Sequence, residues 1–127
     1  MSFKDNFEDF ACINDTISCT AKGFDVVATV LHDEMTSISD FDCYDAKEIA
    51  RWKKDEWHFS GIVLSVSKNG IPLEIKNASL WGIERNIGDN NNYLMDTANE
   101  LLEEAIAEGK AVLITTLEKL NKESNDA

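Results

Sequence analysis

Polar and apolar residues alternate with a period of two in several stretches of this chain, which is the pattern of strands that bury one face. The clearest stretch is 57–67, where every second residue from Ile62 to Val66 is a large aliphatic. Residues 71–75 alternate in the same way, and the intervening Lys68-Asn69-Gly70 readily takes the positive φ angles of a tight turn. We therefore predict that these two stretches form an antiparallel hairpin.

A second hairpin is predicted from residues 16–21 and 24–32, which are rich in β-branched residues and are separated by Lys22-Gly23. Residues 77–84 favour a continuation of the strand at 71–75, through a bulge or kink at Gly82. Trp81 precedes that glycine. We predict that its ring is buried against the C-terminal helix, and the alternative is an exposed anchor for a partner.

Three other stretches have the three- and four-residue spacing of a helix. Phe3, Phe7 and Phe10 favour a short helix within residues 1–15. Residues 45–56 begin with Asp45, and Glu48 three residues later completes a capping box. The longest pattern runs from 93 to about 122, with Gly109 as a point where the helix would end or bend and 121–127 as a frayed tail. Its apolar stripe consists of Leu94, Ala98, Leu101, Leu102, Ala105 and Ile106.

This order of elements predicts one α+β domain over residues 1–127. It contains an antiparallel sheet of about four strands in ββαββα order, with helices packed on one face and a long C-terminal helix. The length is near the commonest domain size, and the 43% of hydrophobic residues is enough for a core. The pattern leaves open whether a second copy covers the other face of the sheet in a homodimer.

Charge changes this picture more than any motif does. The chain has 24 acidic and 12 basic residues, a net charge of −12, whereas solubility needs a charge of only about 2–8. The excess lies in residues 1–48 and 89–127. It repels nucleic acid and anionic membranes, so we expect neither as a direct partner, and it attracts basic protein surfaces.

The sequence predicts a protein of the cytoplasm. No apolar run approaches the roughly 20 residues of a membrane span, and the N-terminus lacks the basic and apolar regions of a signal peptide. Cys12, Cys19 and Cys43 have no C-x-x-C spacing and are interpreted as reduced thiols.

No recognised catalytic, phosphate-binding or zinc-binding motif occurs, so we predict no enzyme activity, no catalytic residues and no cofactor. The spacing of Asp40, Asp42 and Asp45 is superficially that of a calcium loop, but the required glycine and glutamate are missing, so no metal site is predicted. His32 and His58 are interpreted as structural residues. A small-ligand-binding or enzymatic domain is the weakest alternative.

Residues 57–107 resemble a loose set of small acidic proteins encoded by phages and mobile elements. The resemblance is carried by Trp57, by Val-Leu-Ser-Val-Ser-Lys-Asn-Gly at 63–70, by Ala-Ser-Leu-Trp-Gly-Ile-Glu at 78–84, and by Tyr-Leu and Leu-Leu-Glu-Glu-Ala in the last helix. The Ser-Leu-Trp-Gly-Ile-Glu block is its main part. Small acidic proteins of such elements often inhibit host restriction or CRISPR systems, which makes an anti-restriction or anti-CRISPR role the implied function.

The leading functional hypothesis is therefore an inhibitor that binds the basic nucleic-acid-binding surface of a host defence enzyme by mimicking nucleic acid. An acidic adaptor or structural protein without mimicry is the alternative, with Phe3, Phe7 and Phe10 docking into a partner or covering the chain's own sheet. Ten acids are the predicted partner-binding residues: Asp33, Glu34, Asp40, Asp42 and Asp45 in the loop 33–45, and Asp96, Glu100, Glu103, Glu104 and Glu108 on the last helix.

Overall fold

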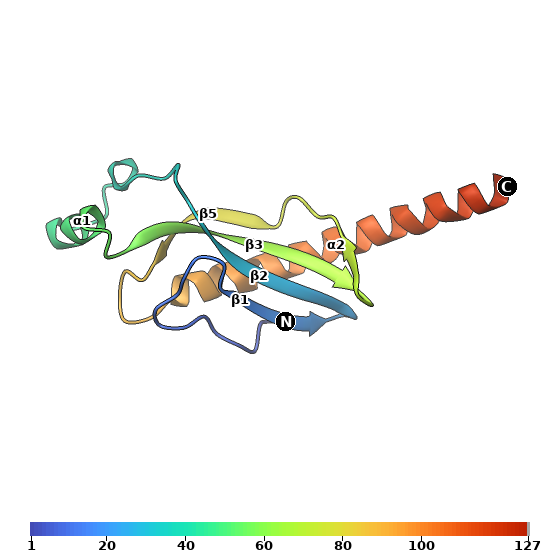
Figure 1. The fold of residues 1–127 in the computed structure, drawn as a ribbon, viewed down its shortest axis with the longest axis horizontal. Coiled ribbons are helices and arrows are strands. Elements are labelled where there is room, and N and C mark those ends of the chain that lie inside the picture. The colour runs from blue at the N-terminus through green and yellow to red at the C-terminus, as the bar shows by residue number, and fades with distance from the viewer. Residues whose placement is uncertain (127) are drawn as a thin grey trace.

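The chain folds around a five-stranded antiparallel sheet (Figure 1). The computed structural model describes residues 1–126, with side chains described to residue 122. The strands are β1 (Thr16–Ala21), β2 (Phe24–His32), β3 (His58–Lys68), β4 (Ile71–Leu73) and β5 (Ser79–Arg85). β2 occupies one edge of β3, and the other edge is shared by β5, along the first half of β3, and by β4, along its last residues.

Both predicted hairpins are confirmed, because their turn residues have the positive φ angles that the sequence favours. Lys22 and Gly23 have φ angles of 52° and 80°, and Asn69 and Gly70 have 51° and 79°. The irregularity at Gly82 is also confirmed: its φ is 76°, and the β3–β5 register shifts between Ser60 and Ile62. β5 is nevertheless a separate strand, since residues 74–78 between β4 and β5 lie outside the sheet.

Helix α2 (Asn92–Asp126) packs on one face of the sheet and builds the main core. Its predicted apolar stripe is confirmed as buried, facing Val26, Val30, Ile62 and Leu64 of the sheet. The expected end of the helix at Gly109 is wrong, because the helix is continuous there. The predicted frayed tail is also wrong up to Asp126, and residue 127 lies outside the described residues.

The N-terminal segment, residues 1–15, is not the predicted short helix. Phe3 and Phe7 are buried in the main core, whereas Phe10 is 69% exposed. The backbone N–H groups of Phe3 and Ala11 donate to the side chains of Asn99 and Asn86, both at 2.8 Å. Tertiary hydrogen bonds of this kind replace those of a helix, so the rings cover the sheet from an irregular chain.

Helix α1 (Ala46–Lys53) lies beyond one end of the sheet, with the short 3-10 helix η1 (Ile38–Asp40) before it (Figure 1). A second cluster, centred on buried Trp57 and Phe59, joins this region to the sheet. The predicted capping box of Asp45 and Glu48 is confirmed. The two helices do not lie on one face, and three strands rather than two separate them, so the α+β class holds while the ββαββα order does not.

Candidate functional site

Seven exposed carboxylates lie on α2 and on the N-terminal segment that runs beside it. The N-terminal segment lies along the first turns of α2, because Asn91 Nδ2 donates to the carbonyl oxygens of Glu8 and Asp9 at 2.9 and 3.0 Å. We name the result the helix-side acidic surface. It consists of Asp5, Glu8 and Asp9 from the N-terminal segment and Asp96, Glu100, Glu103 and Glu104 from α2.

Helix geometry explains why the four α2 acids share this surface. At 100° per residue they span about 100° of the helix circumference, on the side opposite buried Ala98. Asp96, Glu100 and Glu104 follow one another at intervals of four residues, which is about 6 Å along the axis. The three N-terminal acids were missed as site residues, although the acidic composition of residues 1–15 was the signal that could have indicated them.

Glu108 does not belong to the helix-side acidic surface, although its spacing on α2 predicts that it should. Its two carboxylate oxygens accept the backbone N–H groups of Lys76, at 2.7 Å, and Asn77, at 3.1 Å. The residue is half-buried. Glu108 therefore fastens the β4–β5 connection to α2, and its carboxylate is already engaged.

Asp33 is also not free to meet a partner, because its side chain is buried and accepts four hydrogen bonds. The donors are the N–H groups of Met35, Thr36 and Gly82 and the hydroxyl of Thr36, at 2.6–3.0 Å. Burial by itself raises the pKa of this carboxyl, but the hydrogen bonds outweigh it and hold the pKa below its ordinary value. Asp33 therefore fixes the loop after β2 to the bulge of β5.

The remaining loop acids lie apart from the helix-side acidic surface, around η1 and α1 (Figure 1). Asp40 and Asp45 accept backbone hydrogen bonds in two capping boxes, while Glu34 and Asp42 are exposed. The ten predicted acids are thus divided between two regions.

Trp81 lies on the sheet face away from α2, so the prediction of a ring buried against that helix is wrong. A methyl group at Gly61 would come within 2.2 Å of Trp81 Cε3, which places the indole flat on the β3 backbone. The side that carries Gly61 is opposite to that of Ile62, which faces α2. Trp81 is 47% exposed.

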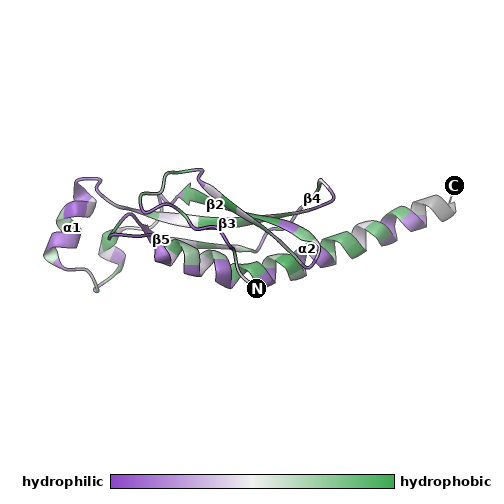
Figure 2. Cartoon of the chain, turned by 90° about the horizontal axis from the view of Figure 1, so that it is seen from below, coloured by the Kyte–Doolittle hydropathy of each residue, from purple (hydrophilic) through white to green (hydrophobic). Residues whose placement is uncertain are grey.

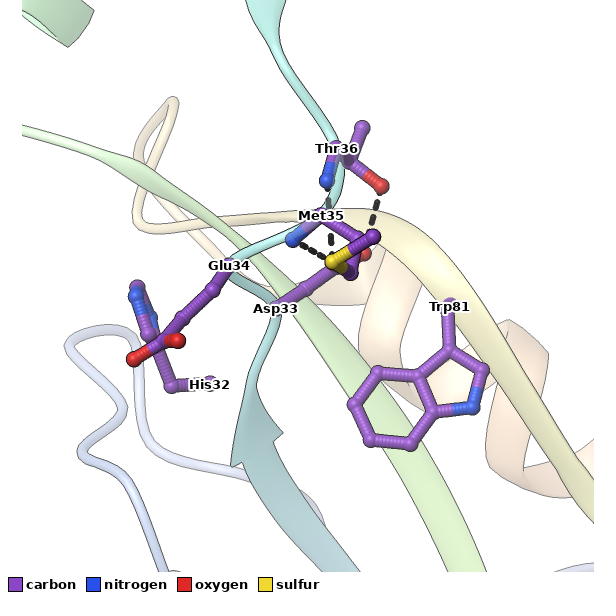
Figure 3. A pocket seen from close by; sticks show the side chains of 6 residues that line it. All are labelled: His32, Asp33, Glu34, Met35, Thr36 and Trp81. Carbon is purple, nitrogen blue, oxygen red and sulfur yellow. Dashed lines mark hydrogen bonds between the residues drawn. The ribbon is translucent and has the colours of Figure 1, made fainter.

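A hollow of about 550 Å³ lies beside Trp81 (Figure 3). Figure 3 shows His32 and Glu34 on one side, the indole on the other, and Asp33 and Met35 between them. Met35 is 91% exposed. An exposed aromatic ring and a flexible thioether are adaptable apolar contacts of the kind found at protein interfaces.

The two histidines lie near each other, with ring centroids 6.1 Å apart, and His58 Nε2 is 3.6 Å from Asp55 Oδ1. Among residues 1–122, no group of three or more His, Cys, Asp and Glu side chains could hold a metal ion. None of the described helices has the length and apolar character needed to cross a membrane.

Ion pairing is nearly absent from the described side chains. The contact between His58 and Asp55 is the single one within 4.0 Å that joins an acidic and a basic side chain there. None of the seven carboxylates of the helix-side acidic surface therefore lies within 4.0 Å of a lysine or arginine nitrogen among the described side chains.

No protein-family model, curated protein or solved structure matches the chain.

Proposed function

We propose that the chain is an inhibitor that binds the basic nucleic-acid-binding surface of another protein, and that the helix-side acidic surface makes the contact. The observation that carries the proposal is the group of seven exposed carboxylates that no lysine or arginine of the described chain pairs with. A rigid helix holds four of them. Preorganised charge of one sign favours association with a surface of the opposite sign.

Nucleic acid mimicry is the mode of binding that we propose. Duplex DNA presents one negative charge per about 1.7 Å of axis, and its protein partners meet it with lysines and arginines. Carboxylates about 6 Å apart along α2 present a similar row of charge on a protein scaffold. A restriction or CRISPR complex of a host cell has a basic groove of the required kind and is the proposed class of target.

Two variants with the same net charge test which acids matter. The helix variant carries Glu100→Lys, Glu103→Lys and Glu104→Lys, and the control carries Glu34→Lys, Asp42→Lys and Glu56→Lys on the other acidic region. Each changes the net charge from −12 to −6 and replaces exposed side chains. Each variant and the wild type would compete with a labelled DNA duplex for proteins captured from a bacterial lysate.

We expect the wild type and the control to displace the duplex and the helix variant to fail. Displacement should also weaken steeply as salt rises, because the attraction is between exposed charges. Equal displacement by both variants, or an affinity that does not change with salt, would show that the helix-side acidic surface does not bind the target.

An adaptor role is the second candidate, and the exposure of Trp81 beside the hollow favours it. Buried aromatic anchors contribute much of the affinity of protein interfaces. If Trp81→Ala abolishes binding of a captured partner and the helix variant does not, the contact is made on the sheet face away from α2 and the adaptor role is favoured.

A further inference from the structure

The second half of α2 extends beyond the sheet and carries apolar side chains that nothing in the described chain covers (Figures 1 and 2). Every described residue from Ile114 to Lys122 is exposed. Leu117 is 51% exposed and Leu120 is 56% exposed. The extension from Ile114 to Asp126 is about 20 Å long at 1.5 Å per residue.

These leucines continue the side of α2 that packs on the sheet. Val112 and Leu113 are half-buried against the main core, and Leu113, Leu117 and Leu120 follow at intervals of four and three residues. That alternation is the seam spacing of a two-stranded coiled coil. Single helices of this length are marginal in water without a packed apolar face, so the extension is suited to pairing with another helix.

Charge indicates what kind of helix fits there. The extension from Ile114 to Asp126 carries two lysines and three acids, so it is close to neutral although the whole chain has a net charge of −12. Two copies of this acidic protein therefore repel each other only weakly along the extension. Thr116 and Asn121, which flank the seam, are uncharged, so neither adds repulsion beside the leucines.

We propose that two copies of the chain form a homodimer by antiparallel pairing of these extensions, with the two-fold axis near Glu118 and Lys119. Leu117 of one copy then packs against Leu120 of the other. Parallel pairing through the same seam is excluded by shape, because the second helix would run into the sheet that the first half of α2 covers (Figure 2). This proposal is independent of the proposed function.

Leu117→Asp and Thr115→Asp make a matched pair of test variants. Both residues are exposed, both changes add one negative charge, and the two positions lie about 160° apart around the helix. Sedimentation equilibrium of the full chain should show a dimer for the wild type and Thr115→Asp. For Leu117→Asp the dimer dissociation constant should rise by at least about tenfold, with an unchanged circular dichroism spectrum.

Salt separates this dimer from the proposed binding of a basic target. Raising the salt concentration should tighten the dimer, because it screens the repulsion between two acidic copies, whereas it should weaken binding of a basic target. The salt response of the dimer and that of target binding are measured separately, so one proposal can fail while the other is still tested.

Orientation is tested by mixing Leu117→Cys and Leu120→Cys proteins, in which Cys12, Cys19 and Cys43 are replaced by serine, under oxidising conditions. Antiparallel pairing predicts that the mixture cross-links more than either variant alone, and parallel pairing predicts the reverse.

A monomer at every concentration would overturn the proposal. Binding of the wild type, but not Leu117→Asp, to vesicles of anionic phospholipid without dimerisation would overturn it as well, and would assign the seam to a lipid surface.

Discussion

Trp57 directly precedes β3, and Trp81 lies on β5, the strand that pairs with β3. The two side chains differ sharply in burial. Trp57 is completely buried, and its Nε1 donates to the carbonyl oxygen of Glu48 at 2.9 Å, whereas Trp81 covers Gly61 and is 47% exposed. Trp57→Ala should lower the free energy of unfolding by about 3–5 kcal/mol through cavity formation, and Trp81→Ala by clearly less. Urea denaturation of both variants measures this. Equal losses would mean that Trp81 is part of a core.

Asp33 gives the second prediction for a single residue. Asp33→Asn should lower the free energy of unfolding at neutral pH by about 1–3 kcal/mol, because four donors lose their charged acceptor. Glu34→Gln, the exposed neighbour, should have little effect.

The pH dependence of the Asp33 effect has a defined sign. The folded-state pKa of Asp33 is lowered, so its stabilisation is present above the unfolded pKa of about 3.9 and is lost as the pH falls through the lower folded value. The difference between wild type and Asp33→Asn should therefore be constant from pH 7 to about pH 5 and shrink below about pH 4. A difference that grows on acidification would contradict the assigned role.

Residues whose partners are near in sequence were predictable, and those with distant partners were not. The capping box of Asp45 and Glu48 is a local signal, and it is confirmed. Asp33 and Glu108 receive hydrogen bonds from Gly82 and from Lys76 and Asn77, which only the tertiary fold brings close. No pattern in the sequence distinguishes their carboxylates from free ones.

At the scale of elements, turn chemistry made the hairpins predictable, whereas tertiary contacts determined the N-terminal segment. Lys22-Gly23 and Asn69-Gly70 specify their turns locally. The phenylalanine spacing in residues 1–15 is helical, but the backbone of this segment is held by the side chains of Asn86, Asn91 and Asn99. In this short segment the conformation is therefore determined by side-chain hydrogen bonds to the backbone and not by the helical spacing of the phenylalanines.

Gly109 determines how closely α2 approaches the sheet. A methyl group there would lie 2.9 Å from Val66 Cγ1. Gly109→Ala should therefore destabilise the protein by about 1–3 kcal/mol through overpacking, against the gain of up to about 1 kcal/mol expected from helix propensity alone.

A double-mutant cycle with Val66→Ala tests this origin. The double variant should lose less stability than the sum of the single losses, because the shortened side chain makes room for the added methyl. Additive losses would place the cause elsewhere than in the contact between Gly109 and Val66.

The whole molecule carries its negative charge with almost no internal compensation. Because only one acid–base contact occurs among the described side chains, added salt should raise the melting temperature by screening self-repulsion. The Glu100→Lys, Glu103→Lys, Glu104→Lys variant, at −6, should show a smaller rise in thermal melts at increasing sodium chloride. A wild-type melting temperature that falls with salt would contradict this account.

Strand β3 is hydrogen-bonded along both edges, by β2 on one side and by β4 and β5 on the other. Its amides are consequently shielded by partners from both halves of the chain, so fraying of either hairpin exposes only one of its edges. In deuterium exchange, the amides in the middle of β3 should be the last to label, at a rate set by unfolding of the entire domain. This strand therefore reports the global stability of the protein, whereas the extension of α2 should exchange by local opening unless a second copy protects it.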